Sequence, residues 1–244
     1  MNWRIFLETM PEGDATWWQM LASGLGWTLA CAATAWIIAL AAGTSIGIAR
    51  TGTSRAASRV AATYVELFRN IPLIIQFFLW YFVLPELCPP LKRWVVQADP
   101  AAVQFLAATL CLGLFTSARI AEQVRAGIES LGRGQRQAAR AMGLNEAQCY
   151  RHVLLPVTFR VIMPPLTSEL MNLVKNTAVA YSIGLAELFF RTREMGEITF
   201  RYFEAFAAAT LAYMVIALAA NRAMRFIERR IAVPGVAGTA RSAH

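Results

Sequence analysis

The sequence is poor in charged residues and contains almost no lysine. Charged residues make up 16% of its 244 residues, whereas a soluble domain usually carries about 25%. Lys92 and Lys175 are the only lysines, and neither follows a glycine. A phosphate-binding loop of the type G-x-x-x-x-G-K-[ST] is therefore excluded, and the composition favours a chain that lies in a membrane.

Cysteine and histidine lack the spacings that indicate a metal site or a disulfide framework. The cysteines and histidines are Cys31, Cys88, Cys111, Cys149, His152 and His244, and only Cys149 and His152 lie close together. No C-x-x-C motif occurs, and the lone C-x-x-H of Cys149 and His152 lacks the second ligand pair of a zinc site. We therefore expect no metal site, no catalytic residue and cysteines that serve only in packing.

Uncharged runs long enough to cross a bilayer recur along the chain, since a spanning helix needs about 17 to 25 apolar residues. They predict an all-α integral membrane protein with five transmembrane helices, at about Leu21–Ala49, Asn70–Leu84, Ala101–Ala118, Pro165–Leu188 and Ala205–Asn221. The start MNWRIFLETMPEGD is too acidic for a cleavable signal, so the first span is expected to remain. We expect a single transmembrane domain over residues 1–230 and a disordered tail over 231–244.

The basic residues are divided unequally between the two sides of this membrane protein. One side receives fifteen arginines: Arg50, Arg55, Arg59, Arg119, Arg125, Arg133, Arg136, Arg140, Arg151, Arg160, Arg222, Arg225, Arg229, Arg230 and Arg241. By the positive-inside rule that side is the cytoplasm, so the N-terminus is predicted outside and the C-terminus inside. Because the arginines border apolar runs and form no single patch, a nucleic-acid partner is not expected.

The longest cytoplasmic loop, about residues 119–164, joins the third and fourth spans. Gln135–Met142 is rich in good helix formers, and Gly143 is the residue type expected just after a helix. Asn145 and Gln148 have the spacing of a capping box, which predicts a second short helix that ends at Pro156. Two short helices with an alanine-rich surface indicate a docking site for another protein.

Four collinear stretches carry a resemblance to a known family. They are QAARAMG (Gln137–Gly143) followed by LLP (Leu154–Pro156), YVELFRNIPLIIQFF (Tyr64–Phe78), GLFTSARIAEQVRAGI (Gly113–Ile128) and TSELMNLVKNTAVAYSIGL (Thr167–Leu185). The first resembles the cytoplasmic "EAA" signature of permease subunits from bacterial ATP-binding-cassette (ABC) importers. The others resemble the polar amino acid branch, and they look most similar to glutamate/aspartate importer permeases.

This resemblance implies a multi-pass inner-membrane protein that does no chemistry itself. Its implied partners are two ATPase subunits that hydrolyse ATP with Mg, a second permease subunit and an extracytoplasmic solute-binding protein. A heterodimer is favoured, and a homodimer stays open. The implied coupling surface consists of Gln137, Ala138, Ala139, Arg140, Met142, Gly143, Leu144, Leu155 and Pro156. Gln137 replaces the usual glutamate of the signature, which removes one charge from this surface.

Polar residues inside the spans are candidates for the substrate pathway, because such residues are energetically unfavourable in lipid. In the fourth span they are Ser168, Glu169, Asn172, Lys175, Asn176 and Ser182, within one stripe of an ideal helix, and Gln76 adds a candidate in the second. The structural alternative is that these groups hold helices together. For Glu66 with Arg69, and for Arg119, Glu122 and Arg125, we favour structural roles at the interface.

Other functions stay open at this stage. Glu169 and Lys175 could act as acid and base in a membrane enzyme, although no nucleophile or metal accompanies them. An ion-coupled carrier is less consistent, because such folds often contain internal repeats and none is evident. Within the importer family, glutamine, histidine or basic amino acids are alternative substrates. The G-x-x-x-G at Gly43–Gly47 is interpreted as a helix-packing motif.

Overall fold

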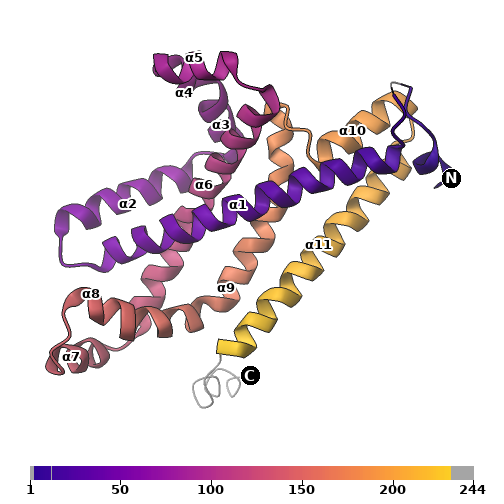
Figure 1. The fold of residues 1–244 in the computed structure, drawn as a ribbon. Helices are drawn as coiled ribbons and strands as arrows, with labels where there is room; N and C mark the ends of the chain where they lie inside the picture. The colour runs from indigo at the N-terminus through magenta and orange to yellow at the C-terminus, as the bar shows by residue number, and fades with distance from the viewer. Residues whose placement is uncertain (1–2, 12, 232–244) are drawn as a thin grey trace.

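The structure, a computed structural model, describes residues 3–11 and 13–231, and this part of the chain is almost wholly helical (Figure 1). The α-helices are α1 (Trp17–Thr51), α2 (Arg55–Asn70), α3 (Leu73–Phe78), α4 (Leu84–Leu87), α5 (Pro89–Gln97), α6 (Pro100–Ser130), α7 (Arg133–Ala141), α8 (Glu146–Cys149), α9 (Leu155–Asn176), α10 (Leu188–Thr199) and α11 (Tyr202–Ile231). Two 3₁₀ segments, η1 (Trp3–Leu7) and η4 (Thr177–Ile183), and two π segments, η2 (Leu79–Val83) and η3 (Tyr150–Leu154), complete the order. The predicted tail lies outside the described residues from position 232 onward.

Four helices in the described residues are long and apolar enough to cross a membrane. They are α1, α6, the continuous helix Glu146–Ile183 and α11. A fifth candidate is the bent pair Arg55–Asn70 and Leu73–Leu87, whose two arms meet at 107°. The prediction of an all-α membrane protein is confirmed, and the described residues contain four or five candidate spans.

Helices α1 and α6 pack closely along the G-x-x-x-G motif. A Cβ atom at Gly43 would lie 2.7 Å from the Cβ of Ile120, and a Cβ at Gly47 would lie 2.7 Å from the Cβ of Val124. Such separations are too short for real atoms, so only glycine permits this approach. The packing interpretation of Gly43–Gly47 is therefore confirmed, with α6 of the same chain as the partner helix.

The second predicted span is shifted by three residues, to Leu73–Leu87, and a sharp corner joins it to α2. Helix α2 ends at Asn70 and α3 begins at Leu73, after Ile71 and Pro72. The Gln76 side chain is buried, and its amide donates hydrogen bonds of 2.9 Å to the carbonyls of both Phe68 and Ile71. These bonds satisfy carbonyls that the end of α2 leaves free, so Gln76 stabilises the corner.

The fourth predicted span ends at Ile183, five residues before the predicted end at about Leu188. Helix α9 ends at Asn176 and tightens into the 3₁₀ segment η4, after which Gly184 adopts φ 87° in the left-handed region. Glu187 then caps the separate helix α10, its carboxylate accepting from the N–H groups of Phe189 and Phe190. The fourth span is thus confirmed as one helix, but its predicted end at about Leu188 was too late, because the turn at Gly184 lies in an uncharged stretch and is invisible to hydropathy.

Pro156 does not end the second loop helix, which corrects that prediction. The helix continues from α8 through the π segment η3 into α9, with Pro156 in the first turn of α9. Proline lacks only its own N–H, and a first turn or a widened π turn tolerates that loss. The loop and the fourth span are consequently one continuous helix.

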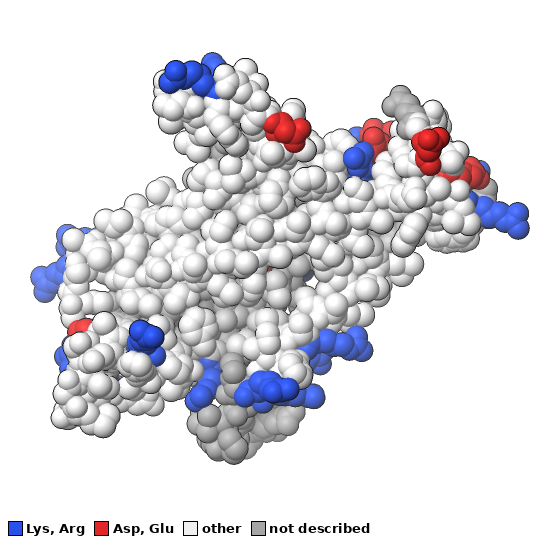
Figure 2. Space-filling view, viewed as in Figure 1, with Lys and Arg blue, Asp and Glu red and all other residues white. Residues whose placement is uncertain are grey.

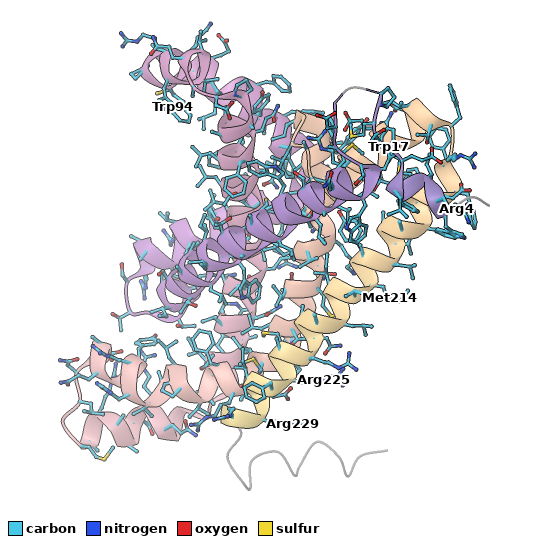
Figure 3. All side chains as sticks on the ribbon, turned by 45° about the vertical axis from the view of Figure 1, so that its right-hand side comes forward. Arg4, Trp17, Trp94, Met214, Arg225 and Arg229 are labelled. Atoms are coloured by element: carbon cyan, nitrogen blue, oxygen red, sulfur yellow. The ribbon has the colours of Figure 1, made fainter. Side chains whose placement is uncertain are left out.

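Charge divides the molecule into two ends. We call the end with α7, α8 and the C-terminal part of α11 the α7 end, and the end with η1, α5 and α10 the α10 end (Figure 1). Basic atoms border the α7 end, whereas acidic atoms gather near the N-terminus and α10 (Figure 2). Arg225 and Arg229 lie on the lower part of α11, and Arg4 and Trp17 lie at the opposite end (Figure 3).

Candidate functional site

The α7–α8 hairpin, residues 133–149, has the bend that the sequence predicts. Helix α7 ends at Ala141, and Gly143 adopts φ 83°, where a side chain would strain the backbone. Asn145 and Gln148 form a complete capping box, each side chain accepting from the other residue's backbone N–H. Helix α7 therefore ends next to the predicted Met142, and the second helix begins at the predicted Glu146.

Ion pairs join the two helices of the hairpin. Arg136 contacts Glu146 at 2.7 Å, and Arg140 pairs with the other oxygen of the same carboxylate. The pairs cross the bend at Gly143, so they hold the two short helices at a fixed angle. A rigid hairpin can transmit a force applied to its tip.

The predicted coupling residues are mostly exposed. Gln137, Ala138, Arg140, Met142, Gly143 and Pro156 are exposed, Leu144 and Leu155 are half-buried, and Ala139 is buried. The Met142 side chain is 72% exposed, which is unusual for a large apolar group outside a lipid-facing helix. The exposed residues form an open surface, whereas Ala139 belongs to the apolar core that also contains Cys149, Tyr150 and Leu154.

A polar cavity lies between α2, α6 and α9. It is lined by Arg69, Arg119, Glu122, Gln123 and Glu169 and has a volume of about 430 Å³. The Gln123 amide donates to Glu169 at 3.3 Å, and the Arg119 guanidinium lies 3.9 Å from the other carboxylate oxygen. We call it the polar chamber; its size is that of a small-ligand site, and it presents groups of both charges.

Only part of the predicted polar stripe reaches this chamber. Glu169 lines it, while Ser168 and Lys175 are exposed elsewhere on α9 and Asn172 and Asn176 are half-buried. Ser182 lies beyond the end of α9, in η4, and its buried hydroxyl has no hydrogen-bond partner. Ser182 therefore does not continue the stripe that the other five residues form on α9, because the 3₁₀ segment changes the rotation per residue.

Arg69 and Arg119 are chamber residues that the sequence interpretation assigned to the interface. The predicted pair of Glu66 with Arg69 is not formed among the described residues, and the Arg69 side chain faces the chamber. Arg119 lies over the ring of Phe115, 4.9 Å from its centroid. Only the fold shows that these two arginines line the chamber. The available sequence signal was that Arg69 and Arg119 each flank an apolar run.

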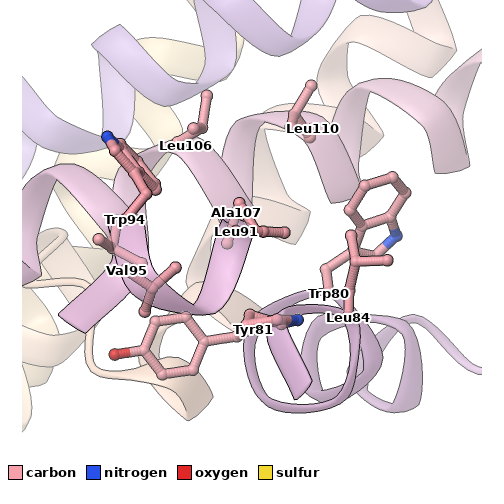
Figure 4. A pocket seen from close by; sticks show the side chains of 11 residues that line it. Trp80, Tyr81, Leu84, Leu91, Trp94, Val95, Leu106, Ala107 and Leu110 are labelled. Carbon is pink, nitrogen blue, oxygen red and sulfur yellow. The ribbon is translucent and has the colours of Figure 1, made fainter. Parts of the chain in front are cut away.

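A second, smaller cavity has the opposite chemistry. It measures about 60 Å³ and is enclosed by apolar side chains of η2, α4, α5 and α6, among them Trp80, Leu84, Trp94 and Leu106 (Figure 4). Its walls offer a polar solute almost no partner, since buried polar groups require hydrogen bonds. The polar chamber is therefore the better candidate for a solute pathway.

Glu187, the N-cap residue of α10, is a buried acid that the sequence analysis did not single out. Its carboxylate also accepts from the Tyr213 hydroxyl at 3.1 Å, and the neighbouring N–H of Leu188 donates to Thr28 at 3.1 Å. Through these contacts α10 is fixed to both α1 and α11. The one sequence sign of this role is that Glu187 stands directly before a helix, at its N-cap position.

Known proteins resemble the chain along most of its length. Residues 39–233 match the family described as "Binding-protein-dependent transport system inner membrane component". The glutamate/aspartate import permease protein GltJ of Escherichia coli (strain K12) is 48% identical over 239 residues, which are 97% of each chain. The glutamine transport system permease protein GlnP of the same organism is 32% identical over 177 residues, 72% of this chain and 77% of that one.

Solved structures agree with these relatives. A chain from the crystal structure of an amino acid ABC transporter with histidines has a TM-score of 0.72 and 30% identity, covering 87% of this chain and 94% of its own. A chain of the inward-facing MetNI methionine ABC transporter has a TM-score of 0.71 at 21% identity, covering 88% and 97%, which shows a shared fold. Since the family is one of transport subunits, the membrane-enzyme alternative is excluded. The chain belongs to the inner-membrane permease family of binding-protein-dependent ABC importers.

Proposed function

We propose that this permease imports glutamate and aspartate. The observation that carries the substrate assignment is the polar chamber, in which Arg69 and Arg119 accompany Glu122 and Glu169. A dicarboxylic amino acid presents two carboxylates and one ammonium group, and guanidinium groups bind carboxylates through paired hydrogen bonds. The relative GltJ, at 48% identity over nearly the whole chain, supports the same substrate class.

The proposed pathway combines the chamber with η4, the 3₁₀ end of the fourth span. Glu169 faces the chamber, and Lys175 and Asn176 lie directly before η4, where Ser182 has an unpartnered hydroxyl. Ser168 and Asn172 complete this proposed path, whereas Gln76 acts from the neighbouring corner by fixing α3.

The proposed orientation places the α7 end in the cytoplasm and the α10 end outside. The distribution of charge supports it, because basic residues border the α7 end (Figure 2). With this orientation the N-terminus is outside, and the exposed surface of the α7–α8 hairpin faces the cytoplasmic ATPase subunits. Two ATPase subunits, a second permease subunit and an extracytoplasmic binding protein complete the proposed assembly, with a heterodimer favoured.

Substrate competition tests the transport proposal. In proteoliposomes that contain the complete complex and the binding protein, unlabelled glutamate and aspartate should inhibit ATP-dependent uptake of labelled glutamate. Glutamine, histidine and arginine at the same concentration should inhibit it far less. Stronger inhibition by arginine or glutamine would overturn the dicarboxylate assignment while leaving the importer intact.

A substitution at Gly143 tests the coupling surface separately. Gly143→Asp should abolish ATP-driven uptake and leave insertion in the membrane intact, because it adds a charge and a Cβ at φ 83° on the exposed bend. Gly143→Asn is the matched control, since asparagine tolerates the left-handed region and carries no charge. Normal uptake by Gly143→Asp would remove the hairpin from the coupling mechanism.

A further inference from the structure

The last residue of α1 is bonded to the hairpin. The C-terminal carbonyls of a helix have no partner within the helix. Here the Tyr150 hydroxyl donates to the carbonyl oxygen of Thr51 at 2.9 Å and lies 3.1 Å from the Thr51 hydroxyl. The preceding carbonyl, of Arg50, accepts from the Ser58 hydroxyl at 3.1 Å. The end of α1 is thus tied both to α2 and to a residue 99 positions away.

Tyr150 is itself held firmly by the hairpin. It is only 8% exposed and is the first residue of the π segment η3. The guanidinium of Arg136, on α7, lies 5.5 Å from the centroid of its ring and also contacts Glu146 at 2.7 Å. A cation above the ring restrains the ring, and π turns occur frequently at functional positions.

A cavity beside this contact leaves few other residues that could connect the hairpin to the end of α1. A cavity of about 520 Å³, lined in part by Arg50, Thr51, Glu129, Arg136 and Leu154, separates α7 from the ends of α1 and α6. Among the described side chains of α7, Ala139 is the buried one. The polar contact between the hairpin and the end of α1 is therefore made by Tyr150. Arg50, next to Thr51, in turn pairs with Glu122 on α6.

We propose that Tyr150 is a positioning residue that fixes the α7–α8 hairpin to the end of α1. This inference rests on the proposed coupling function of the hairpin. A displacement of the hairpin by the ATPase then moves α1 and its partner α6 together with the directly connected helix α9. Without the Tyr150 hydroxyl, the hairpin shifts without carrying α1, and ATP is hydrolysed with less transport.

The test removes the hydroxyl group from each of two tyrosines and compares the results. Tyr150→Phe removes the hydroxyl and keeps the ring. Tyr64→Phe is the matched control, because the Tyr64 hydroxyl joins α2 to α6 through Leu114 at 2.9 Å and Ser117 at 2.7 Å, away from the hairpin. In proteoliposomes with the complete complex, the measured quantity is ATP hydrolysed per glutamate transported.

Tyr150→Phe should raise this ratio about fivefold, the change in an equilibrium that one hydrogen bond of ordinary net strength supplies. Tyr64→Phe should leave the ratio at the wild-type value. Thr51→Val, which keeps the accepting carbonyl, should raise it less than Tyr150→Phe. An unchanged ratio in Tyr150→Phe, or an equal rise in Tyr64→Phe, would overturn the proposal.

A cross-linking experiment distinguishes failure of the Tyr150 proposal from failure of the coupling function proposed for the hairpin. Met142→Cys, in a background with Cys88→Ser, should cross-link to the ATPase in the wild-type and Tyr150→Phe complexes alike, because Met142 is exposed on the bend. Cross-linking with an unchanged ATP ratio would refute the role of Tyr150 alone. Loss of the Met142→Cys cross-link in the otherwise wild-type complex would refute the coupling assignment itself.

Discussion

Helices α6 and α11 are similar in length and apolar character, but they occupy different positions in the bundle. In the most apolar part of α6 the rest of the chain buries 56% of the residues, against 17% in α11. The buried face of α6 is rich in small residues such as Ala108, Gly113, Ala118 and Ala121. In α11 large side chains such as Met214 point away from the bundle (Figure 3).

The comparison shows what hydropathy alone does not distinguish. Both helices are long and apolar enough to cross a bilayer, but only small residues permit the close packing of a helix at the centre of the bundle. Helix α6 also supplies Arg119, Glu122 and Gln123 to the polar chamber. Substitutions in α6 should therefore affect both folding and transport, whereas α11 should tolerate change.

The largest effect is expected where α1 meets α6. Gly43→Leu should prevent accumulation of folded permease, because even a Cβ at Gly43 would meet Ile120 at 2.7 Å. Gly26→Leu, on the same helix with no atom within 4 Å of the added Cβ, is the control and should leave the yield unchanged. Size-exclusion chromatography in detergent measures both, and equal yields would contradict the proposed role of the contact.

A smaller loss is expected from a cavity in α6. Leu112→Ala should lower the free energy of unfolding by about 3 kcal/mol, as large-to-small substitutions do in packed cores. Leu218→Ala in α11 should change it by less than about 1 kcal/mol, since Leu218 is 47% exposed and Leu112 is fully buried. Denaturant titration in detergent checks the pair, and similar values would remove the distinction between the two helices.

The next effect concerns transport without loss of stability. Arg119→Ala should reduce glutamate uptake about tenfold at low substrate concentration, because a charged hydrogen bond contributes about 1.5 to 3 kcal/mol. Arg225→Ala, an exposed arginine of α11, should leave uptake unchanged. The measurement is the initial rate of labelled glutamate uptake, and equal rates for the two variants would exclude Arg119 from the pathway.

The smallest effect is expected in the fourth span, whose helix Glu146–Ile183 is buried to an intermediate 28%. Lys175→Ala should lower uptake about threefold without disrupting assembly, because an exposed charge is screened by water. Arg160→Ala, on the same helix near the α7 end, serves as control. Unaltered uptake kinetics in Lys175→Ala would assign Lys175 a structural role.

The sequence predicted the features that local chemistry determines. The bend at Gly143, the capping box of Asn145 and Gln148, and the packing role of Gly43–Gly47 follow from residue types at short spacing. The structure confirms each of them. Family membership also followed from such short motifs, and the comparisons confirm it.

Features that depend on tertiary contacts could not be predicted in this way. The helix continues through Pro156 because the π segment η3 precedes it, and a π turn has no simple residue signature. The turn that ends the fourth span after η4 lies in an uncharged stretch, so only Gly184 marked it. The polar chamber joins residues from α2, α6 and α9, and no spacing in one segment reveals such a meeting.

The corner between α2 and α3 has a consequence for where the protein can flex. Gln76 joins the last turn of α2 to the start of α3 with two bonds of 2.9 Å at the 107° bend. Because these bonds connect the two arms, they oppose any change in the angle between α2 and α3. The corner between α2 and α3 is therefore expected to keep its angle while other segments of the permease change position during transport.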